Sequence, residues 1–193
     1  MHAPTRQRLT EAAARRFYRD GFRSVGLDQV LGDVGISKTA FYKHFTCKEE
    51  LVLAALEMQN EWLQVTFRDM VRELGGASPV GQLRALLDVV ERITATDAFQ
   101  GCIFVNVAIE FPLPHEPAHV AAAAHKQAME ETVYDLAVLA GASRPREMAQ
   151  ELCLVMDGAY VTRQVMGDSR GITTARRVAD RIIAAYLPPA AAA

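Results

Sequence analysis

A short run of polar and cationic side chains in the first quarter of the chain has the chemistry to bind a polyanion. Lys38 and Lys43 offer ammonium groups, and Thr39 offers a hydroxyl and a methyl group. In the major groove of DNA, ammonium groups donate to guanine edges or to phosphate, and small methyl groups contact thymine. Phe41 and Phe45 are four residues apart, so they would anchor one face of the same segment as a helix. The spacing therefore predicts a short helix that presents polar groups to DNA.

The residues before this segment predict two helices that would position it. Thr5 is a possible N-cap of the first helix, and Gly21 is its expected end. The second helix is indicated by an apolar stripe at helical spacing, formed by Leu27, Val30, Leu31 and Val34. Gly35 supplies the next turn, and Ser37 is a favourable N-cap for the polar segment. Two short helices joined by a glycine-containing turn form a helix-turn-helix unit.

A long fourth helix is expected next, because Thr46 and Glu49 fit a capping box. It would continue to Gly75, about 40 Å at the usual rise. Five more helices are predicted to follow and to end before Pro188, and no run of alternating β-branched residues suggests a strand. We therefore predict an all-α fold of about nine helices. Its domains are a DNA-binding head at residues 1–47, a ligand-binding and dimerisation bundle at 48–187, and a disordered tail at 188–193.

Composition and charge favour a globular protein with a basic head. Half of the residues are hydrophobic, and the apolar stretches fall short of the roughly 20 residues that span a bilayer. The N-terminus lacks the apolar core of a secretory signal, and three cysteines without metal-ligand spacing suit a reducing compartment, so a cytoplasmic protein is expected. The first 50 residues hold nine Lys or Arg against six Asp or Glu, whereas the rest hold twelve against seventeen. This asymmetry directs a polyanion to the head.

Residues 5 to 56 resemble the head of the tetracycline-repressor (TetR/AcrR) family of bacterial transcription regulators. The residues that fall in the family's order and spacing are Phe17, Gly21-Phe22, Gly35-Ile36-Ser37-Lys38, Phe41-Tyr42-Lys43-His44-Phe45 and Lys48-Glu49-Glu50-Leu51. The remainder resembles the family only in helix count and in its divergence. The resemblance implies a homodimeric regulator, usually a repressor, that binds a near-palindromic double-stranded DNA operator. It also implies release from DNA by a small-molecule effector in the C-terminal domain.

The resemblance and the groove chemistry together assign DNA contact to nine residues. They are Gly26, Ser37, Lys38, Thr39, Ala40, Tyr42, Lys43, His44 and Lys48. Residues 38–40 are expected to face bases, and residues 42–44 resemble the family's phosphate clamp. Val25-Gly26 stands where the family usually has Thr or Ser, so only a backbone amide is available there. More of the operator affinity would then depend on Lys43, Lys48, Arg6 and Arg8.

The C-terminal domain offers candidates for an effector pocket, although bulky inward residues are also typical of a filled core. The candidates are Trp62, Phe67, Cys102, Phe104, Asn106, Glu110, Tyr134 and Met156. Cys102, Asn106 and Glu110 are four apart and share one face of a predicted helix. Either this face lines the pocket, or Cys102 reacts with electrophiles, or Cys102 is a small buried thiol.

The last two predicted helices carry an excess of apolar surface, which favours a partner subunit over them. The expected interface residues are Leu152, Val155, Ala159, Val178, Ile182 and Tyr186. The alternative is that both helices fill the core of a monomer. His115, His119 and His125 invite a metal site, but solvated histidines are the preferred interpretation, so no metal or cofactor is expected.

The sequence also bears on two other classes of function. An enzyme is disfavoured, because the sequence has no nucleophile elbow, no phosphate-binding glycine loop, no HExxH and no pair of Glu-x-x-His motifs. A helix-turn-helix protein without an effector, such as a nucleoid or division-site factor, would share the same head. A C-terminal domain with a filled core would favour it. The sequence leaves open the effector, the operator and target genes, the direction of regulation, the redox activity of Cys102 and the pairing of dimers on DNA.

Overall fold

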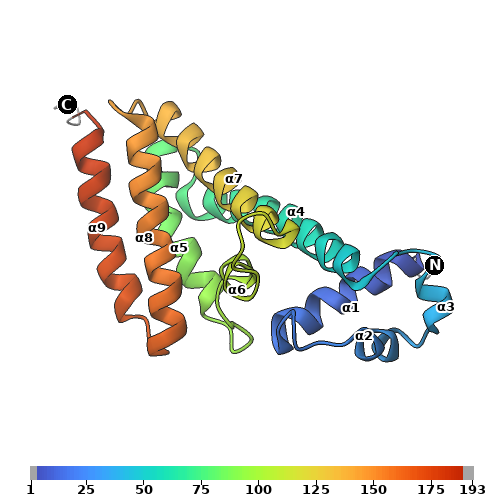
Figure 1. Ribbon diagram of the computed structural model, residues 1–193. Coiled ribbons are helices and arrows are strands. Elements are labelled where there is room, and N and C mark those ends of the chain that lie inside the picture. Colours follow the sequence, from blue (N-terminus) through green and yellow to red (C-terminus); the bar gives the residue numbers. More distant parts are fainter. Residues whose placement is uncertain (1–3, 189–193) are drawn as a thin grey trace. The chain divides into compact units, whose positions relative to one another are not determined.

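The structure, a computed structural model, describes residues 4–188, and these residues form nine α-helices and no strand (Figure 1). In chain order the helices are α1 (Thr5–Asp20), α2 (Leu27–Val34), α3 (Lys38–Phe41), α4 (Lys48–Gly75), α5 (Pro79–Thr94), α6 (Ile103–Glu110), α7 (Pro117–Leu139), α8 (Pro145–Met166) and α9 (Arg170–Tyr186). The all-α prediction is confirmed. Apart from Pro188, the predicted disordered tail lies outside the described residues.

The chain divides into two compact units. The first unit holds Met1–Leu63 and Ile103–His125, so α6 and the start of α7 pack with the head helices. The second unit holds Gln64–Cys102 and Lys126–Ala193, and it includes α5, α8 and α9. The predicted head ends where α4 begins, at Lys48, whereas the compact units divide inside α4 and α7, because each of these long helices contributes to both.

Aromatic side chains form the centre of the first unit. Phe17 of α1 stacks on Phe22 with ring centroids 5.3 Å apart, and Phe41 stacks on Phe45 at 5.6 Å. All four side chains are at most 1% exposed. Full burial of a ring of this size stabilises a fold by about 1.5–3 kcal/mol. The predicted role of Phe41 and Phe45 as anchors is confirmed.

The turns before the polar segment follow the predicted chemistry. Gly35 ends α2 in the left-handed region, at a φ of 73°, which side chains with a Cβ rarely adopt. The Ser37 hydroxyl accepts the Ala40 N–H at 3.2 Å and caps α3. Both predicted signals, the glycine stop and the serine cap, therefore set the short connection between α2 and α3.

The second unit is a helical bundle in which α5 packs on both α8 and α9, and α8 lies beside α9 (Figure 1). Its core consists of buried apolar side chains, among them Leu83, Leu86, Leu87, Met148 and Leu152. At the surface, Arg176 of α9 donates to Asp88 and Glu91 of α5. Partly exposed ion pairs contribute little to stability, so burial of the apolar side chains holds this unit together.

Leu86→Ala is expected to lower the free energy of unfolding by about 2–5 kcal/mol, because it removes a fully buried side chain and leaves a cavity in the second unit. The same truncation at Leu139, which is 70% exposed at the end of α7, should change it by at most about 0.5 kcal/mol. Urea unfolding followed by circular dichroism at one protein concentration measures both. Equal losses in the two variants would contradict the described core.

Candidate nucleic-acid interface

Residues 37–44, the recognition segment, combine exposed polar groups with buried anchors. The exposed side chains are Ser37, Lys38, Thr39, Tyr42 and Lys43, and those of Ala40 and His44 are half-buried. α3 is short, and the His44 and Phe45 N–H groups continue it as a turn by donating to the Phe41 carbonyl. Tyr42 is 58% exposed, and its ring meets the buried Phe41 ring edge-on at 5.2 Å. The anchors thus hold a row of polar side chains at the surface.

An ion pair lies at the start of the recognition segment. The Lys38 ammonium is 2.9 Å from the carboxylate of Asp28, which lies in the first turn of α2. The hydrogen bond to Asp28 raises the pKa of Lys38 above its ordinary value. The two side chains are 60% and 74% exposed, so the pair adds little stability. Its effect is to fix a cation and a carboxylate side by side at the edge that we predict to face bases.

Three basic side chains of the head donate to backbone carbonyls. The pairs are Arg6 with His44 at 2.7 Å, Arg8 with Val34 at 2.8 Å, and Lys48 with Phe22 at 2.7 Å. Carbonyls at the ends of helices lack partners within the helix, so such bonds stabilise the head. Sequence reasoning assigned these three cations to phosphate and missed their internal partners, which lie 26 or more residues away along the chain. Lys48 still has ammonium hydrogens for a second acceptor.

The Gly26 amide, the predicted phosphate donor at the start of α2, has a partner within the head. Gly26 caps α2 from an extended backbone conformation, and its N–H donates to the Gln29 side chain at 2.8 Å. A phosphate would reach this amide after the Gln29 side chain had turned away. Contact between Gly26 and DNA therefore stays a prediction, and it now includes competition with Gln29.

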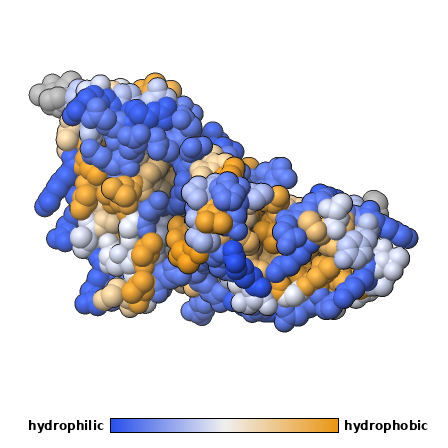
Figure 2. All heavy atoms as spheres, in the orientation of Figure 1, coloured by the Kyte–Doolittle hydropathy of each residue, from blue (hydrophilic) through white to orange (hydrophobic). Residues whose placement is uncertain are grey.

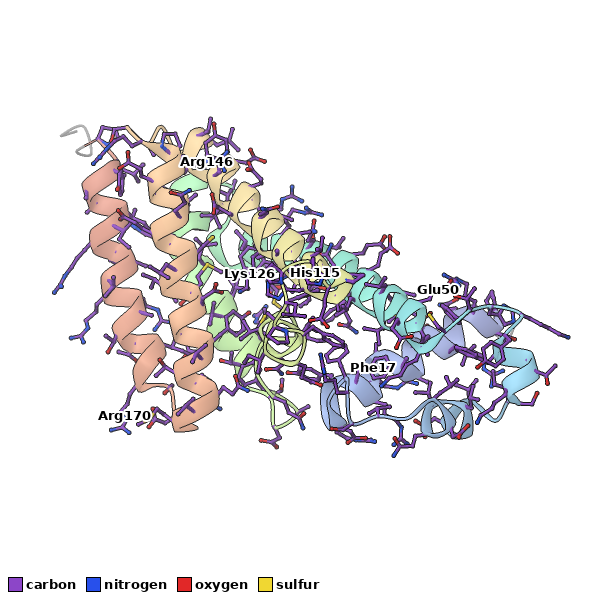
Figure 3. The ribbon with its side chains drawn as sticks, in the orientation of Figure 1. Phe17, Glu50, His115, Lys126, Arg146 and Arg170 are labelled. Atoms are coloured by element: carbon purple, nitrogen blue, oxygen red, sulfur yellow. The ribbon has the colours of Figure 1, made fainter. Side chains whose placement is uncertain are left out.

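The start of α4 has a different cap from the predicted one. The Thr46 N–H and hydroxyl donate to the Glu50 carboxylate at 2.7 and 2.9 Å, so the prediction of Glu49 was wrong. α4 begins at Lys48, and Glu50 lies in its first turn (Figure 3), one helical turn beyond Thr46. The bond from the Thr46 amide lowers the pKa of Glu50, and the charge of Arg6, 3.7 Å away, adds to this.

Four of the predicted effector-pocket residues belong to the first unit. They are Trp62, Phe104, Asn106 and Glu110. Phe104 is buried and stacks on the His125 ring at 3.8 Å, and the His125 Nδ1 is 2.7 Å from the Asn60 side-chain oxygen. Trp62 is 59% exposed, whereas the Glu110 carboxylate accepts backbone N–H groups after α1. Within this unit, Phe104 therefore lies in a buried cluster of polar and aromatic groups.

The other four predicted pocket residues belong to the second unit. They are Phe67, Cys102, Tyr134 and Met156. Phe67 and Met156 are buried in the packed core, and Tyr134 is partly buried against it. The Arg146 guanidinium lies 3.8 Å from the centre of the Tyr134 ring (Figure 3). Phe67 and Met156 thus occupy the positions of core residues, which is the alternative that the sequence left open.

A groove of about 490 Å³ lies along α8 and α9 in the second unit. Its walls include Val155, Ala159 and Val178 from the predicted interface, and none of the eight predicted effector residues. Leu152 and Tyr186 were also predicted for the interface, but they are 0% and 6% exposed because they fill the protomer's own core. Ala159 is 2% exposed as well, so these three side chains offer little surface to a partner, and their place in an interface stays a prediction.

The open apolar surface of α8 consists of residues outside the predicted interface set. Its exposed members are Leu154 at 75%, Val161 at 44%, Val165 at 74% and Met166 at 57%. On α9, Val178 is 37% exposed and Ile182 is half-buried. Figure 2 shows apolar surface over these two helices. Apolar surface that gathers in this way on a soluble domain marks an interaction site more often than a chance exposure.

The histidines of α7 and the segment before it have separate environments. Among residues 4–188, no group of three His, Cys, Asp or Glu side chains is placed to hold a metal ion. His115 is exposed (Figure 3), and the His119 Nδ1 is 2.8 Å from the Phe111 carbonyl oxygen. His125 is 6% exposed, so its interpretation as a solvated histidine is wrong, because stacking on Phe104 removes its ring from water.

The three thiols differ in exposure. Cys47 is exposed, and Cys102 and Cys153 are half-buried. Burial raises the pKa of Cys153 to about 12, and the nearby charges of Asp157 and Glu130 add to the rise. A thiol that stays protonated at neutral pH is a poor nucleophile, because the thiolate is the reactive form.

Models of known protein families match both the N-terminal and the C-terminal part of the chain. A family model for bacterial regulatory proteins of the tetR family matches residues 9–55, and one for the tetracyclin repressor-like C-terminal domain matches residues 79–179. The chain belongs to the TetR family. SCO4454, a TetR-family transcriptional regulator from Streptomyces coelicolor, is 27% identical to this TetR-family chain, with a TM-score of 0.83. The match covers 95% of this chain and 96% of SCO4454.

Other similar proteins are also transcription regulators. A putative TetR regulator, sav143 from Streptomyces avermitilis, is 30% identical with a TM-score of 0.78, and the match covers 92% of this chain and 99% of sav143. The repressor KstR2 of Mycobacterium tuberculosis is 33% identical over 81 residues, which are 42% of this chain and 40% of KstR2. Several curated relatives, KstR2 among them, match over 26% to 62% of their own length.

Family membership fixes the general activity. The protein is a transcriptional regulator with a helix-turn-helix DNA-binding domain, and TetR-family proteins are transcription factors and not enzymes. Members bind DNA operators and typically act as dimers. In the part of the chain from residue 4 to 188, no helix is long and apolar enough to cross a membrane.

Cys47 is expected to be alkylated fastest and Cys153 slowest. At pH 8, the raised pKa of Cys153 keeps its thiol protonated and burial limits access to it, so its rate should be at least about 100-fold below that of the exposed Cys47. Timed labelling with iodoacetamide, followed by peptide mass spectrometry, gives the three rates. Labelling of Cys102 no faster than that of Cys153, with DNA binding unchanged afterwards, would remove the hypothesis that Cys102 senses electrophiles.

Proposed function

We propose that this TetR-family regulator is a homodimeric repressor of the bacterial cytoplasm that binds a near-palindromic operator and leaves it when a small molecule binds the C-terminal domain. The recognition segment carries the DNA-binding part of the proposal. Exposed Lys38, Thr39 and Lys43 stand on a frame of buried Phe41 and Phe45. A helix that enters the major groove needs exposed donors on rigid anchors. The relative KstR2 is a repressor, which supports the same direction of regulation here.

The recognition segment divides its contacts between bases and phosphate. Lys38 and Thr39 face the groove, where the ammonium group meets guanine and the methyl group meets thymine. Tyr42, Lys43 and His44 face the sugar-phosphate backbone. Phosphate contacts release counterions and set the salt dependence of binding, whereas base contacts set the sequence preference. The two groups of residues therefore have different experimental signatures.

Arg6, Arg8 and Lys48 support DNA binding chiefly by shaping the head. Each donates to a backbone carbonyl at 2.7 or 2.8 Å, so each has a structural partner whether or not DNA is present. Replacing Lys48 would remove a phosphate partner and also the bond to Phe22. Lys43 is exposed and separates these effects better.

The dimer forms through the open apolar face of α8 and α9. This face carries Leu154 and Val165, each about three-quarters exposed, beside the groove that Val155 and Val178 line. A two-fold axis would apply the same face of each copy to the other, which buries both. The two heads would then reach major grooves about one helical turn, or a multiple of it, apart.

The effector belongs to the proposal through family resemblance. A DNA-binding protein without an effector is the second candidate. It is favoured by Phe67 and Met156, which are buried among the apolar core side chains of the second unit. The two candidates share the recognition segment and the dimer, and they differ only in release.

Lys43→Ala is expected to weaken binding to operator and to unrelated DNA about equally. It should reduce the slope of log affinity against log salt by about 1, since one phosphate contact is lost. Thr39→Ala should leave the slope unchanged and relax base preference at one position, by less than the about 1–3 kcal/mol of a bidentate base contact. Fluorescence anisotropy at several salt concentrations measures both, on operator DNA selected by the protein from a random pool.

Arg84→Ala is the matched control, because Arg84 is an exposed cation on α5, in the second unit. Its affinity for operator should stay within about twofold of the wild type, because salt screens the interaction between DNA and an exposed charge outside the interface. A slope unchanged in Lys43→Ala would remove Lys43 from the interface. Failure of the wild type to enrich any sequence would refute the operator proposal.

Leu154→Glu is expected to convert the dimer to monomers, because it places an unpaired charge where the proposed interface excludes water. Operator affinity should fall at least about tenfold, since two half-sites are no longer bound by one linked molecule. Leu139→Glu is the control, at a 70% exposed position on α7, and should stay dimeric. Sedimentation equilibrium and operator binding measure the two effects. A dimeric Leu154→Glu protein with full affinity would place the interface elsewhere.

A further inference from the structure

The turn between α1 and α2 is bound by an acidic residue from a distant part of the chain. Glu110 is the last residue of α6, and its carboxylate accepts two consecutive backbone N–H groups of this turn. Oε1 lies 3.0 Å from the Phe22 nitrogen, and Oε2 lies 2.7 Å from the Arg23 nitrogen. Because each oxygen takes one amide, the contact fixes the orientation of the turn as well as its distance from α6.

Side chains around this carboxylate reinforce the same contact. The Phe22 ring meets the Phe111 ring edge-on at 6.3 Å, and the Arg23 guanidinium lies 5.1 Å from the centre of the Phe111 ring. Arg23 also reaches Glu116 at 3.4 Å. Gly21 has a φ of 88°, and a Cβ there would lie 3.4 Å from Glu110 Oε1. Glu110 and Phe111 therefore contact the turn through its backbone and through aromatic and charged groups, whereas the partly exposed Arg23–Glu116 pair adds little.

Phe22 is also bound on its other side. Its carbonyl accepts the Lys48 ammonium at 2.7 Å, from the first residue of α4. The backbone N–H of Phe22 thus donates to the Glu110 carboxylate of α6, and its C=O accepts from the Lys48 ammonium of α4. Four residues later Gly26 caps α2, and a short turn after Gly35 connects α2 to the recognition segment. Small movements of Phe22 would therefore reach α2 and α3 through a short and rigid connection.

We propose that Glu110 is a positioning residue for DNA binding, which holds the α1–α2 turn in the one place from which the recognition segment fits an operator. The assignment rests on the proposed DNA interface of residues 37–44. It assigns Glu110 to the positioning of the DNA-binding head and no longer to the predicted effector pocket. It also makes operator affinity depend on the last turn of α6, because displacement of that turn breaks two charge-assisted bonds at once.

Glu110→Gln in the full-length protein tests this role. A Gln side chain keeps the size but offers one oxygen, and its NH₂ group would face an N–H. Operator affinity should fall on the order of tenfold, since a hydrogen bond to a charged group is lost in the bound geometry. Hydrogen exchange at the Phe22 and Arg23 amides should speed up at least about tenfold. The Ala40 amide, which donates to Ser37, should keep its rate, which shows that the recognition segment is still folded.

Glu116→Gln is the matched control, because Glu116 is also an acid near Arg23, but its carboxylate accepts the Leu113 N–H of its own segment and neither the Phe22 nor the Arg23 amide. Its operator affinity should stay within about twofold of the wild type. Where Glu110→Gln unfolds, Glu110→Asp keeps the charge on a shorter side chain and should show the same pattern in weaker form. Wild-type affinity and wild-type exchange at Phe22 in the Glu110 variants would overturn the inference while the operator proposal stands. Equal losses in the Glu110 and Glu116 variants would also overturn it, whereas a wild type that binds no operator refutes the function itself.

Discussion

The unpaired backbone groups at the ends of the short head helices are the constraint on which the first unit depends. A helix leaves amides and carbonyls open at its two ends, and in short helices these are a large share of the whole backbone. Arg8 satisfies the carbonyl of Val34 at the end of α2. Lys48 and Glu110 satisfy the two sides of Phe22 after α1. A head this small has a limited core, so hydrogen bonds from charged side chains add to the stability that burial of the phenylalanines provides.

This use of charge changes what the basic composition of the head means. Several of its cations have internal partners: Arg6 and Arg8 donate to carbonyls, and Arg16 pairs with Asp33. The net positive charge attracts DNA at long range whatever the partners are, because a field sums over all charges. Contact at short range depends instead on where each exposed cation lies, and Lys38 and Lys43 lie on the recognition segment. Composition therefore indicates the binding face of the head but not the residues that bind.

Local features of the head could be read from the sequence, and long-range ones could not. The Ser37 cap, the Gly35 stop and the Phe41 anchor follow from residues within a turn of each other, so spacing alone predicts them. Glu110 and Phe22 are 88 residues apart, and His125 and Asn60 are 65 apart. No periodicity links such pairs, since only the packed fold brings them together. The sequence shows that Glu110 is a charged residue near the expected end of a helix. It does not show which groups this carboxylate binds.

Helix α8 shows a different limit, because its sequence contains two apolar stripes at helical spacing. One stripe is buried against the protomer's own core and consists of Met148, Leu152, Met156 and Ala159. The other is exposed and consists of Leu154, Val161 and Val165. Periodicity identifies both stripes but does not tell which one packs in the protomer's own core, so it did not show that Leu152 is buried there. Two apolar stripes need two partners, and α5 and α9 cover only one, so the second stripe is the strongest physical reason to expect another copy of the chain.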